Sequence, residues 1–215
     1  THKQILTVQY RMKRNIGNLI SQVFYDGKIA TEVDDKNRTH PIKKFEGKSI
    51  VWIDTSMMNG KDEDRLKGGS FCNYIENTII KKLLECFKNE NVIKDLDIGI
   101  ITGYRGQKEL IRKSVSNGGY DKISKKIDIN TLDAFQGREN DIIIYSTVRT
   151  KNSIGFQKEK ERVNVAFSRA KDLLIICGDM DFFYKFDDPD NKFVEIIDYI
   201  HEHEDECLII SGGEL

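Results

Sequence analysis

The sequence predicts an α/β fold in which helices cover both faces of a parallel sheet. Short apolar runs alternate along the chain with longer segments whose apolar residues recur every three or four positions, as expected for strands followed by helices. The run at 142–148 contains three consecutive isoleucines, so it lacks the alternation of a strand with one solvated face. Such a run is typical of a strand covered on both sides, and it favours a parallel sheet.

In the first half of the chain, strands are expected at 5–8, 49–53 and 97–102. A first helix, ended by Gly27, is indicated by apolar residues at helical spacing, namely Ile16, Leu19, Ile20, Val23 and Phe24. The polar residues 31–48 indicate a surface loop. Ser70 is predicted to cap a second helix with an apolar stripe over 71–87, and a third helix is expected from 103–107 to about Ser114.

In the second half, strands are expected at 127–131, 142–148 and 173–177. A helix is predicted over 159–171, with its inner face formed by Val163, Ala166, Phe167 and Ala170. A final helix is indicated by the spacing of Phe193, Ile196, Ile197 and Ile200. This order of elements points to a parallel sheet between two layers of helices.

The composition is that of an ordinary globular protein. The 215 residues suit one large domain, 1–215, with 181–215 as a C-terminal extension, and the start at Thr1 suggests a piece of a longer protein. A net charge of −1 means that any nucleic-acid partner must be held by a local patch. The four scattered cysteines read as reduced thiols, and no apolar run approaches 18 residues. We therefore expect an intracellular protein, cytoplasmic or nuclear, with no membrane contact.

Two motif-like stretches are set aside. The tripeptide at 47–49, GKS, resembles the end of a phosphate-binding loop, but residue 42 is Ile rather than Gly and a strand rather than a helix follows. The tract at 201–207, HEHEDEC, places two histidines at i and i+2, which do not share a helix face. We expect no metal site.

The stretch 127–150 joins two predicted strands through a polar loop. Asp133 is suited to cap a turn with Gln136 as its partner, Gly137 allows close approach of the backbone, and Glu139 has no apolar role. Polar loops at strand ends are where open α/β sheets bind ligands. An ordinary capped turn with a solvated acid is the alternative, and these residues alone favour it.

Four separated segments together resemble the motifs of superfamily 1 helicases. They are LTVQYRM at 6–12, IGIITGYRGQ at 98–107, the stretch 130–150, and RVNVAFSRAK at 162–171. The resemblance is to the second RecA-like domain of the branch that contains the nonsense-mediated-decay helicase and Senataxin, and it covers about 6–179. It implies a RecA-like, P-loop NTPase-type sheet that forms the C-terminal motor domain of an ATP-dependent helicase or translocase.

By this resemblance, Arg11 and Arg169 reach the γ-phosphate of ATP, where an arginine is worth about 10³ to 10⁵ in rate. Glu139 resembles the acid that accepts hydrogen bonds from the ribose, with Tyr10, Gln136 and Gly137 beside the nucleotide. The cofactor implied is ATP with Mg²⁺, held mainly by an N-terminal RecA-like domain. For either arginine alone, a surface salt bridge is the competing interpretation.

The resemblance also implies a track for single-stranded RNA or DNA formed by five residues: Thr102, Tyr104, Arg105, Thr131 and Arg149. Hydroxyls and backbone N–H groups at strand ends suit phosphates, and an aromatic ring beside a cation suits a single strand. An ordinary polar rim explains these side chains equally well. The chain departs from the family pattern at Gly103, where Pro is usual, at 13–14, where His-Pro is usual, and at Ser168, where Thr is usual.

The chain has no GxxxxGK[ST] and no Asp-Glu pair after an apolar strand. We therefore expect the isolated chain to hydrolyse no ATP and to unwind nothing. The alternative function is a nucleic-acid-binding or protein-docking module that kept the fold but lost the motor. A doubly wound enzyme with a small-molecule cofactor is a third interpretation, disfavoured because no GxGxxG follows a strand.

Overall fold

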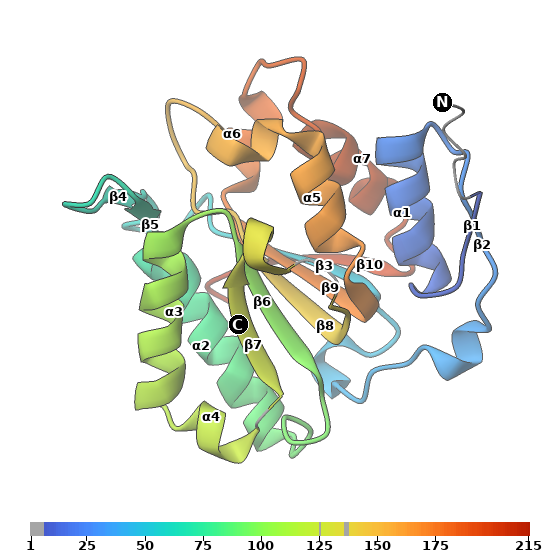
Figure 1. Ribbon diagram of the computed structural model, residues 1–215, viewed down its shortest axis with the longest axis horizontal. Coiled ribbons are helices and arrows are strands. Elements are labelled where there is room, and N and C mark those ends of the chain that lie inside the picture. The colour runs from blue at the N-terminus through green and yellow to red at the C-terminus, as the bar shows by residue number, and fades with distance from the viewer. Residues whose placement is uncertain (1–6, 125, 136–137) are drawn as a thin grey trace.

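The computed structural model describes residues 7–124, 126–135 and 138–215 (Figure 1). Its centre is a parallel sheet in the order β10-β3-β9-β8-β6-β7, formed within these residues by six strands. Their bounds are β3 (Ile50–Asp54), β6 (Ile98–Thr102), β7 (Ile127–Thr131), β8 (Asn140–Ser146), β9 (Ala170–Gly178) and β10 (Cys207–Ser211). The predicted α/β class and parallel sheet are confirmed.

Helices cover both faces of this sheet, as Figure 1 shows. One face carries α1 (Arg14–Tyr25), α5 (Lys160–Phe167), α6 (Met180–Lys185) and α7 (Phe193–Glu202). The other carries α2 (Tyr74–Asn89), α3 (Arg105–Asn117) and α4 (Tyr120–Ile123). Short 3₁₀ turns lie at η1 (Asp35–Asn37), η2 (Lys43–Phe45), η3 (Leu132–Phe135) and η4 (Gly155–Lys158).

The central strands are apolar on both sides because each side has its own core. Ile143 packs into the core under α1, α5 and α7, whereas its neighbours Ile142 and Ile144 pack into the core under α2 and α3. All three are fully buried. The run of isoleucines is therefore explained by two helix layers, because successive side chains of a strand point to opposite faces.

Two smaller strand pairs lie outside the main sheet. β1 (Val8–Gln9) pairs in parallel with β2 (Ala30–Thr31), beside α1. β4 (Asp64–Arg65) pairs antiparallel with β5 (Phe71–Cys72) in a hairpin that projects beside the start of α3 (Figure 1).

The start of α2 differs from the prediction. Asn73, not Ser70, is its N-cap, and the Asn73 side chain accepts a hydrogen bond from the backbone N–H of Glu76. The Ser70 hydroxyl instead accepts from the backbone N–H of Gly106 at 2.9 Å. Phe71 belongs to β5, so the first residue assigned to the helical stripe lies in a strand.

The segment after α7 forms an edge strand. β10 pairs in parallel with β3, with Leu208 opposite Val51 and Ile210 opposite Ile53. The loop 31–48 crosses the surface as predicted, but Ile42 and Phe45 anchor it in the core. In the described part of the chain, no helix has the length and apolar character needed to span a bilayer.

Candidate functional site

Arg11, Glu139 and Arg169 lie together although they are far apart in the sequence. The Arg11 Nε donates to Glu139 Oε2 at 2.7 Å, and the Arg11 Nη1 donates to the backbone carbonyl of Ser168 at 3.2 Å. The backbone N–H of Asn140 donates to the carbonyl of Arg169 at 3.1 Å, which joins the segments that carry Glu139 and Arg169. The structure thus brings these three predicted side chains to one place.

Local hydrogen bonds fix the backbone that carries Arg11. The Gln9 side-chain oxygen accepts from the backbone N–H groups of Arg11 at 2.9 Å and Met12 at 2.8 Å. The Gln9 amide nitrogen donates to the hydroxyl of Thr31 at 2.7 Å, which ties the segment to β2. The backbone N–H of Lys13 donates to the carbonyl of Lys171 at 2.7 Å and so joins it to β9. The hydrogen bonds from Gln9 and the ties to β2 and β9 therefore fix the backbone of the turn that carries the Arg11 side chain.

The electrostatics of this cluster favour an anion. Burial lowers the pKa of Arg169, and the nearby charge of Arg11 lowers it further, while Glu139 opposes the shift. Among the described residues, the buried Nε of Arg169 has no hydrogen-bond partner. Two guanidinium groups and one carboxylate leave a net positive charge. A phosphate oxygen would supply both the missing charge and the missing acceptor.

Tyr10 lies beside this cluster on the surface. Its side chain is 64% exposed, and its hydroxyl donates to Glu32 at 3.0 Å, which raises the pKa of Tyr10. A hollow of about 550 Å³ next to it is lined by Tyr10, Arg11, Tyr25, Asn164 and Ser168, among others. The two remaining residues of the predicted nucleotide group, Gln136 and Gly137, lie outside the described residues.

The position of Glu139 corrects one expectation. Glu139 directly precedes β8 and Arg169 directly precedes β9, so this group lies at the amino ends of the strands. Thr131, at the other end of the same loop, lies at the carboxyl end of β7. Because β7 and β8 are both parallel to β6, the chain between them must cross from one edge of the sheet to the other. The stretch 127–150 therefore contributes residues at both ends of the parallel strands rather than at the carboxyl ends alone.

A second group lies at the carboxyl edge. Tyr104, Arg105 and Thr131 line a cavity of about 620 Å³ together with Phe71 and Phe156. The Tyr104 ring stands edge-on to Phe71 at a centroid distance of 5.6 Å and is tilted against Phe156 at 5.4 Å. Tyr104 is only 4% exposed, and burial raises its pKa. It forms the floor of the cavity rather than a free stacking face.

Thr102 and Arg149 are not brought to the cavity surface. Thr102 is fully buried, and its hydroxyl accepts from the backbone N–H of Tyr104 at 3.4 Å. The Arg149 side chain is 8% exposed, with its Nε 3.2 Å from a carboxylate oxygen of Glu63 and its guanidinium 4.2 Å from the Phe71 ring centroid. Thr102 therefore contacts the backbone of Tyr104, and Arg149 contacts the ring of Phe71, so each lies behind a residue that lines the cavity.

Two buried acids were not identified from the sequence. Glu63 accepts hydrogen bonds from the backbone N–H of Thr150 at 2.9 Å and from its hydroxyl. Glu76, also buried, accepts from the hydroxyl of Ser146 at 2.5 Å and the backbone N–H of Val148 at 2.8 Å. Glu76 stands three residues after Asn73, the N-cap of α2, and this position was missed because the cap was predicted at Ser70. Nothing in the sequence of the 60–70 stretch indicated that Glu63 is buried.

Among the residues that the structure describes, no three His, Cys, Asp or Glu side chains come close enough to hold a metal ion. The four cysteines are free thiols.

The chain is similar to several ATP-dependent helicases. A sequence family described as AAA domain matches residues 1–181. The chain is 36% identical over 182 residues to ATP-dependent helicase NAM7 of Saccharomyces cerevisiae, and 35% identical over 183 residues to ATP-dependent helicase upf1 of Schizosaccharomyces pombe. It is 34% identical over 184 residues to Helicase SEN1 of Saccharomyces cerevisiae.

These alignments cover 80%, 80% and 81% of this chain but only 18%, 19% and 8% of the three relatives. The chain therefore spans less than a fifth of their length. Among solved structures, it aligns over 93% of its length with 98% of the C-terminal domain of a possible DNA helicase from Lactobacillus plantarum WCFS1, at 13% identity and a TM-score of 0.49. The family assignment rests on the sequence relatives.

Proposed function

This chain belongs to the superfamily 1 helicases, in the branch of the nonsense-mediated-decay helicase and Senataxin, and from that premise we propose that it is a C-terminal motor domain that acts on single-stranded RNA or DNA. Its partners are the strand and an N-terminal RecA-like domain. An intracellular location, cytoplasmic or nuclear, stays a prediction.

The observation that carries this proposal is the meeting of Arg11, Glu139 and Arg169 at one edge of the sheet. ATP with Mg²⁺, when bound, supplies the phosphoryl group whose transfer drives the motor. In this role Arg11 and Arg169 contact the γ-phosphate and stabilise the charge that develops there. Glu139 holds the Arg11 guanidinium in place and accepts from the ribose hydroxyls, next to Tyr10, Gln136 and Gly137.

The residues present fit part of the cofactor. The two cations and the unpartnered Nε of Arg169, taken over the described residues, suit the terminal phosphate. The described part of the chain holds no cluster of acids for Mg²⁺. The triphosphate and the ion are therefore assigned mainly to the N-terminal domain, and this chain is assigned the residues that complete the site when the two domains close.

At the opposite edge, Tyr104, Arg105 and Thr131 are assigned to the nucleic-acid track. Their cavity combines an aromatic floor with an exposed guanidinium, which suits an unpaired strand. Thr102 and Arg149 do not contact the strand in this assignment. Thr102 accepts a hydrogen bond from the backbone N–H of Tyr104, and Arg149 packs against the ring of Phe71, so both hold the cavity lining in place. This assignment agrees with the wording of the relatives' names, which describe helicases.

The test is the turnover of the full-length protein that contains this chain. Arg169→Ala and Arg11→Ala should each lower strand-stimulated ATP hydrolysis by about 10³-fold or more, because each removes charge from the γ-phosphate. Binding of a labelled single strand should stay within a few-fold of wild type. Arg169→Lys should also lose most activity, since lysine keeps the charge but not the planar fork.

Lys185→Ala is the matched control, because Lys185 is an exposed cation that pairs with Asp181 on α6. It should keep wild-type turnover. Normal hydrolysis by Arg169→Ala would rule out the role assigned to that residue. A full-length wild type that bound the strand but hydrolysed no ATP would favour the docking module instead.

A further inference from the structure

The hairpin, defined here as residues 61–73, lies outside the four segments that carry the family resemblance. It connects β3 to α2 and includes β4 and β5, with the tip at 66–69. In Figure 1 it projects from the molecule above the start of α3 and beside the carboxyl edge of the sheet. Its position next to the cavity raises the question of what it contacts.

The hairpin is fixed to the start of α3. The Gln107 side chain accepts from the backbone N–H of Asn73 at 2.8 Å and donates to the Asn73 carbonyl at 3.2 Å. The backbone N–H of Gly106 donates to the hydroxyl of Ser70 at 2.9 Å. A Cβ on Gly106 would lie 2.9 Å from the Phe71 carbonyl oxygen, so the contact is a close one. The hairpin therefore holds a set place beside Tyr104 and Arg105.

A second set of contacts fixes the hairpin to the segment after β8. Glu63 pairs with Arg149 and accepts two hydrogen bonds from Thr150. The Asn73 amide nitrogen donates to the carbonyls of Lys61 at 2.7 Å and Val148 at 3.2 Å. The base of the hairpin thus lies between the two segments assigned to the nucleic-acid track at this edge, and buried side chains hold it there.

The hairpin contributes a wall to the cavity. Gly69, Ser70 and Phe71 line it, together with Thr131 and Phe156. Phe156 is 47% exposed, and its ring lies between Tyr104, at a centroid distance of 5.4 Å, and the Arg162 guanidinium, 5.4 Å from the ring centroid. The cavity volume of about 620 Å³ lies within the range of about 300–1,000 Å³ that is usual for sites of small organic groups. Two phenylalanine rings at its walls suit a flat aromatic guest.

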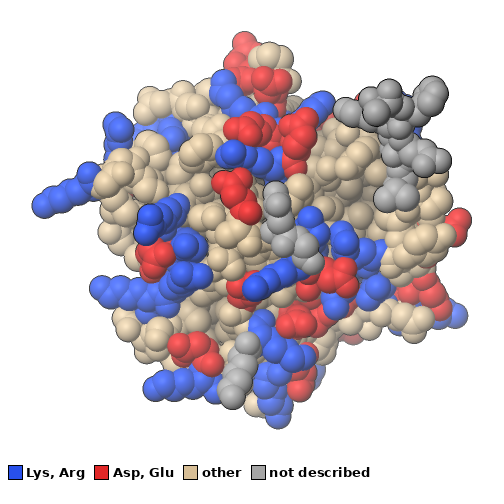
Figure 2. All heavy atoms as spheres, viewed as in Figure 1, with Lys and Arg blue, Asp and Glu red and all other residues tan. Residues whose placement is uncertain are grey.

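Positive charge surrounds the mouth of the cavity. Arg65 and Lys67 near the tip, and Arg105 on α3, are exposed and form no ion pair within the described residues. The nearby acids Asp62 and Asp133 are paired with Lys151 at 3.2 Å and Arg162 at 3.7 Å, and Asp64 in β4 is the exposed acid that offsets part of this positive charge. Figure 2 shows Lys and Arg side chains over the hairpin and along α3, with a few acids between them. Unpaired cations around an aromatic pocket complement a polyanion that carries bases.

We propose that the hairpin is a further nucleic-acid contact of this domain, one that no part of the resemblance assigns. The cavity lined by Phe71 and Phe156 receives one unstacked base, with Phe156 as the more exposed ring, while Arg65, Lys67 and Arg105 contact the phosphates on either side of it. The occupant is single-stranded nucleic acid, because a duplex does not offer the face of a base. The inference rests on the proposed function and extends its track beyond the sheet edge.

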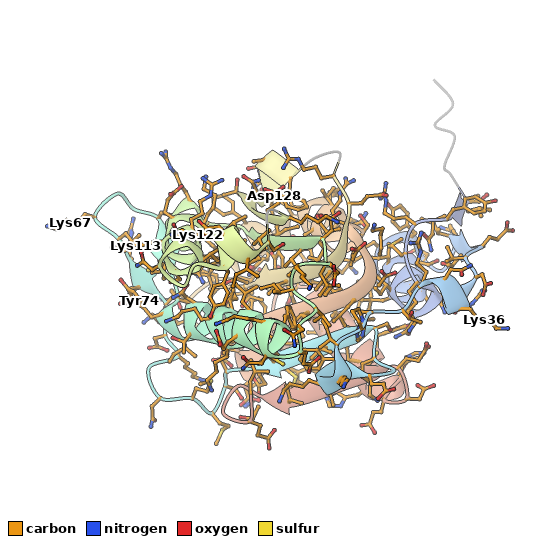
Figure 3. The ribbon with its side chains drawn as sticks, turned by 90° about the horizontal axis from the view of Figure 1, so that it is seen from below. Lys36, Lys67, Tyr74, Lys113, Lys122 and Asp128 are labelled. Carbon is orange, nitrogen blue, oxygen red and sulfur yellow. The ribbon has the colours of Figure 1, made fainter. Side chains whose placement is uncertain are left out.

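The first test is binding of the 215-residue chain to a 5′-labelled oligothymidylate, followed by fluorescence anisotropy across a salt series. The double variant Arg65→Ala/Lys67→Ala should weaken binding about tenfold at low salt. It should also reduce the slope of log K against log salt by about 1.4, at about 0.7 for each phosphate that is no longer neutralised. Lys36→Ala is the control, because Lys36 is also exposed but lies at the far end of the molecule from Lys67 (Figure 3).

The second test measures stacking with 2-aminopurine in the strand. Wild type should quench its fluorescence, and Phe156→Ala should remove most of the quenching with unchanged folding, since Phe156 is half exposed. A strand with an abasic site in place of the stacked base should bind wild type and Phe156→Ala equally.

The outcomes separate this inference from the proposed function. If wild type binds the strand and both Arg65→Ala/Lys67→Ala and Phe156→Ala bind like it, the hairpin contact is wrong and the proposed track stands. If the wild-type chain binds no single strand at low salt, the track itself fails and the hairpin contact fails with it. An equal effect in the Lys36→Ala control would show that the change is general charge screening, which also overturns the hairpin contact.

Discussion

At the scale of single residues, Glu76 has the most consequential environment. It is fully buried, and hydroxyl and backbone donors from Ser146, Thr147 and Val148 surround its carboxyl group. Burial raises the pKa of Glu76 from 4.5 to about 7, against the opposing effect of these hydrogen bonds. Val148 adopts a positive φ of 70°, which is unusual for a β-branched residue. Glu76 therefore stabilises a strained turn just before Arg149.

This pKa predicts a pH dependence of stability. Between pH 4.5 and 7 the unfolded chain releases the Glu76 proton while the folded protein still holds it, so the free energy of unfolding falls as pH rises. Relative to Glu76→Gln, which has no such proton, wild type should lose about 2.5 kcal/mol from pH 5 to 8, because the slope of about 1.4 kcal/mol per pH unit levels off near pH 7. Urea unfolding of both proteins across this range measures the difference.

His40 titrates in the same range, and burial lowers its pKa, so its own contribution has the opposite slope. That contribution is common to wild type and Glu76→Gln and cancels in their difference. Parallel curves for the two proteins would show that Glu76 stays ionised when folded.

The sequence predicted which residues belong to the candidate sites better than it predicted how exposed their side chains are. Arg11, Glu139 and Arg169 were named from motifs, and their meeting agrees with the roles that the resemblance implies. Arg149 was named in the same way but lies against Glu63 and Phe71. A motif specifies the order of residues in one segment. The partner that buries Arg149 comes from another segment, whose fold local sequence did not indicate.

At the scale of elements, the contact between α1 and the β1–β2 pair positions Arg11. Gly17 allows this contact, since a Cβ there would lie 2.1 Å from the Thr31 hydroxyl oxygen and 2.6 Å from the Gln9 amide nitrogen. Gly17→Ala would normally gain about 1 kcal/mol in a helix, but this clash should cost up to about 3 kcal/mol. We expect a net loss of about 2 kcal/mol in the free energy of unfolding.

Chemical denaturation measures the loss, with Asn18→Ala as the control on the exposed side of the same helix. That change should gain about 0.5 kcal/mol at most, from helix propensity alone. Because Gln9 holds the backbone of Arg11, Gly17→Ala should also lower turnover of the full-length protein. A stabilised Gly17→Ala would mean that the strand pair moves aside at little cost.

Long periodic elements were predicted well, and short paired ones were not. The stripe from Ile16 to Phe24 and the run of isoleucines in β8 follow directly from burial on defined faces. The two-residue strands β4 and β5 are held in place because the flanking residues Glu63 and Asn73 bond to Thr150 and Gln107, which belong to other segments. The start of α2 was misplaced for the same reason. Apolar Phe71 fits a helical stripe by spacing, but its ring packs against Tyr104.

At the scale of the whole molecule, the two candidate sites lie at opposite ends of the same parallel strands. β8 begins directly after Glu139 and ends at Ser146, shortly before Arg149. Its 7 residues span roughly 23 Å at about 3.3 Å each, and helices cover both faces. A movement of the residues at one end of these strands is therefore transmitted to the other end through a rigid, close-packed sheet rather than through a flexible loop. Under the proposed function, this sheet is the part of the chain that would couple closure on a nucleotide to movement of a strand.

The same geometry predicts what the 215-residue chain does by itself. It contains the two arginines that we propose for the γ-phosphate, but its sequence contains no GxxxxGK[ST] to hold the triphosphate. We expect no ATP turnover above background in a phosphate-release assay, with or without a single strand, because charge stabilisation requires a substrate positioned by the other domain. The same preparation should still bind the labelled strand, which shows that it is folded. Turnover by this chain that disappeared in Arg169→Ala would contradict the division of the site, because it would place a complete hydrolytic centre within these residues.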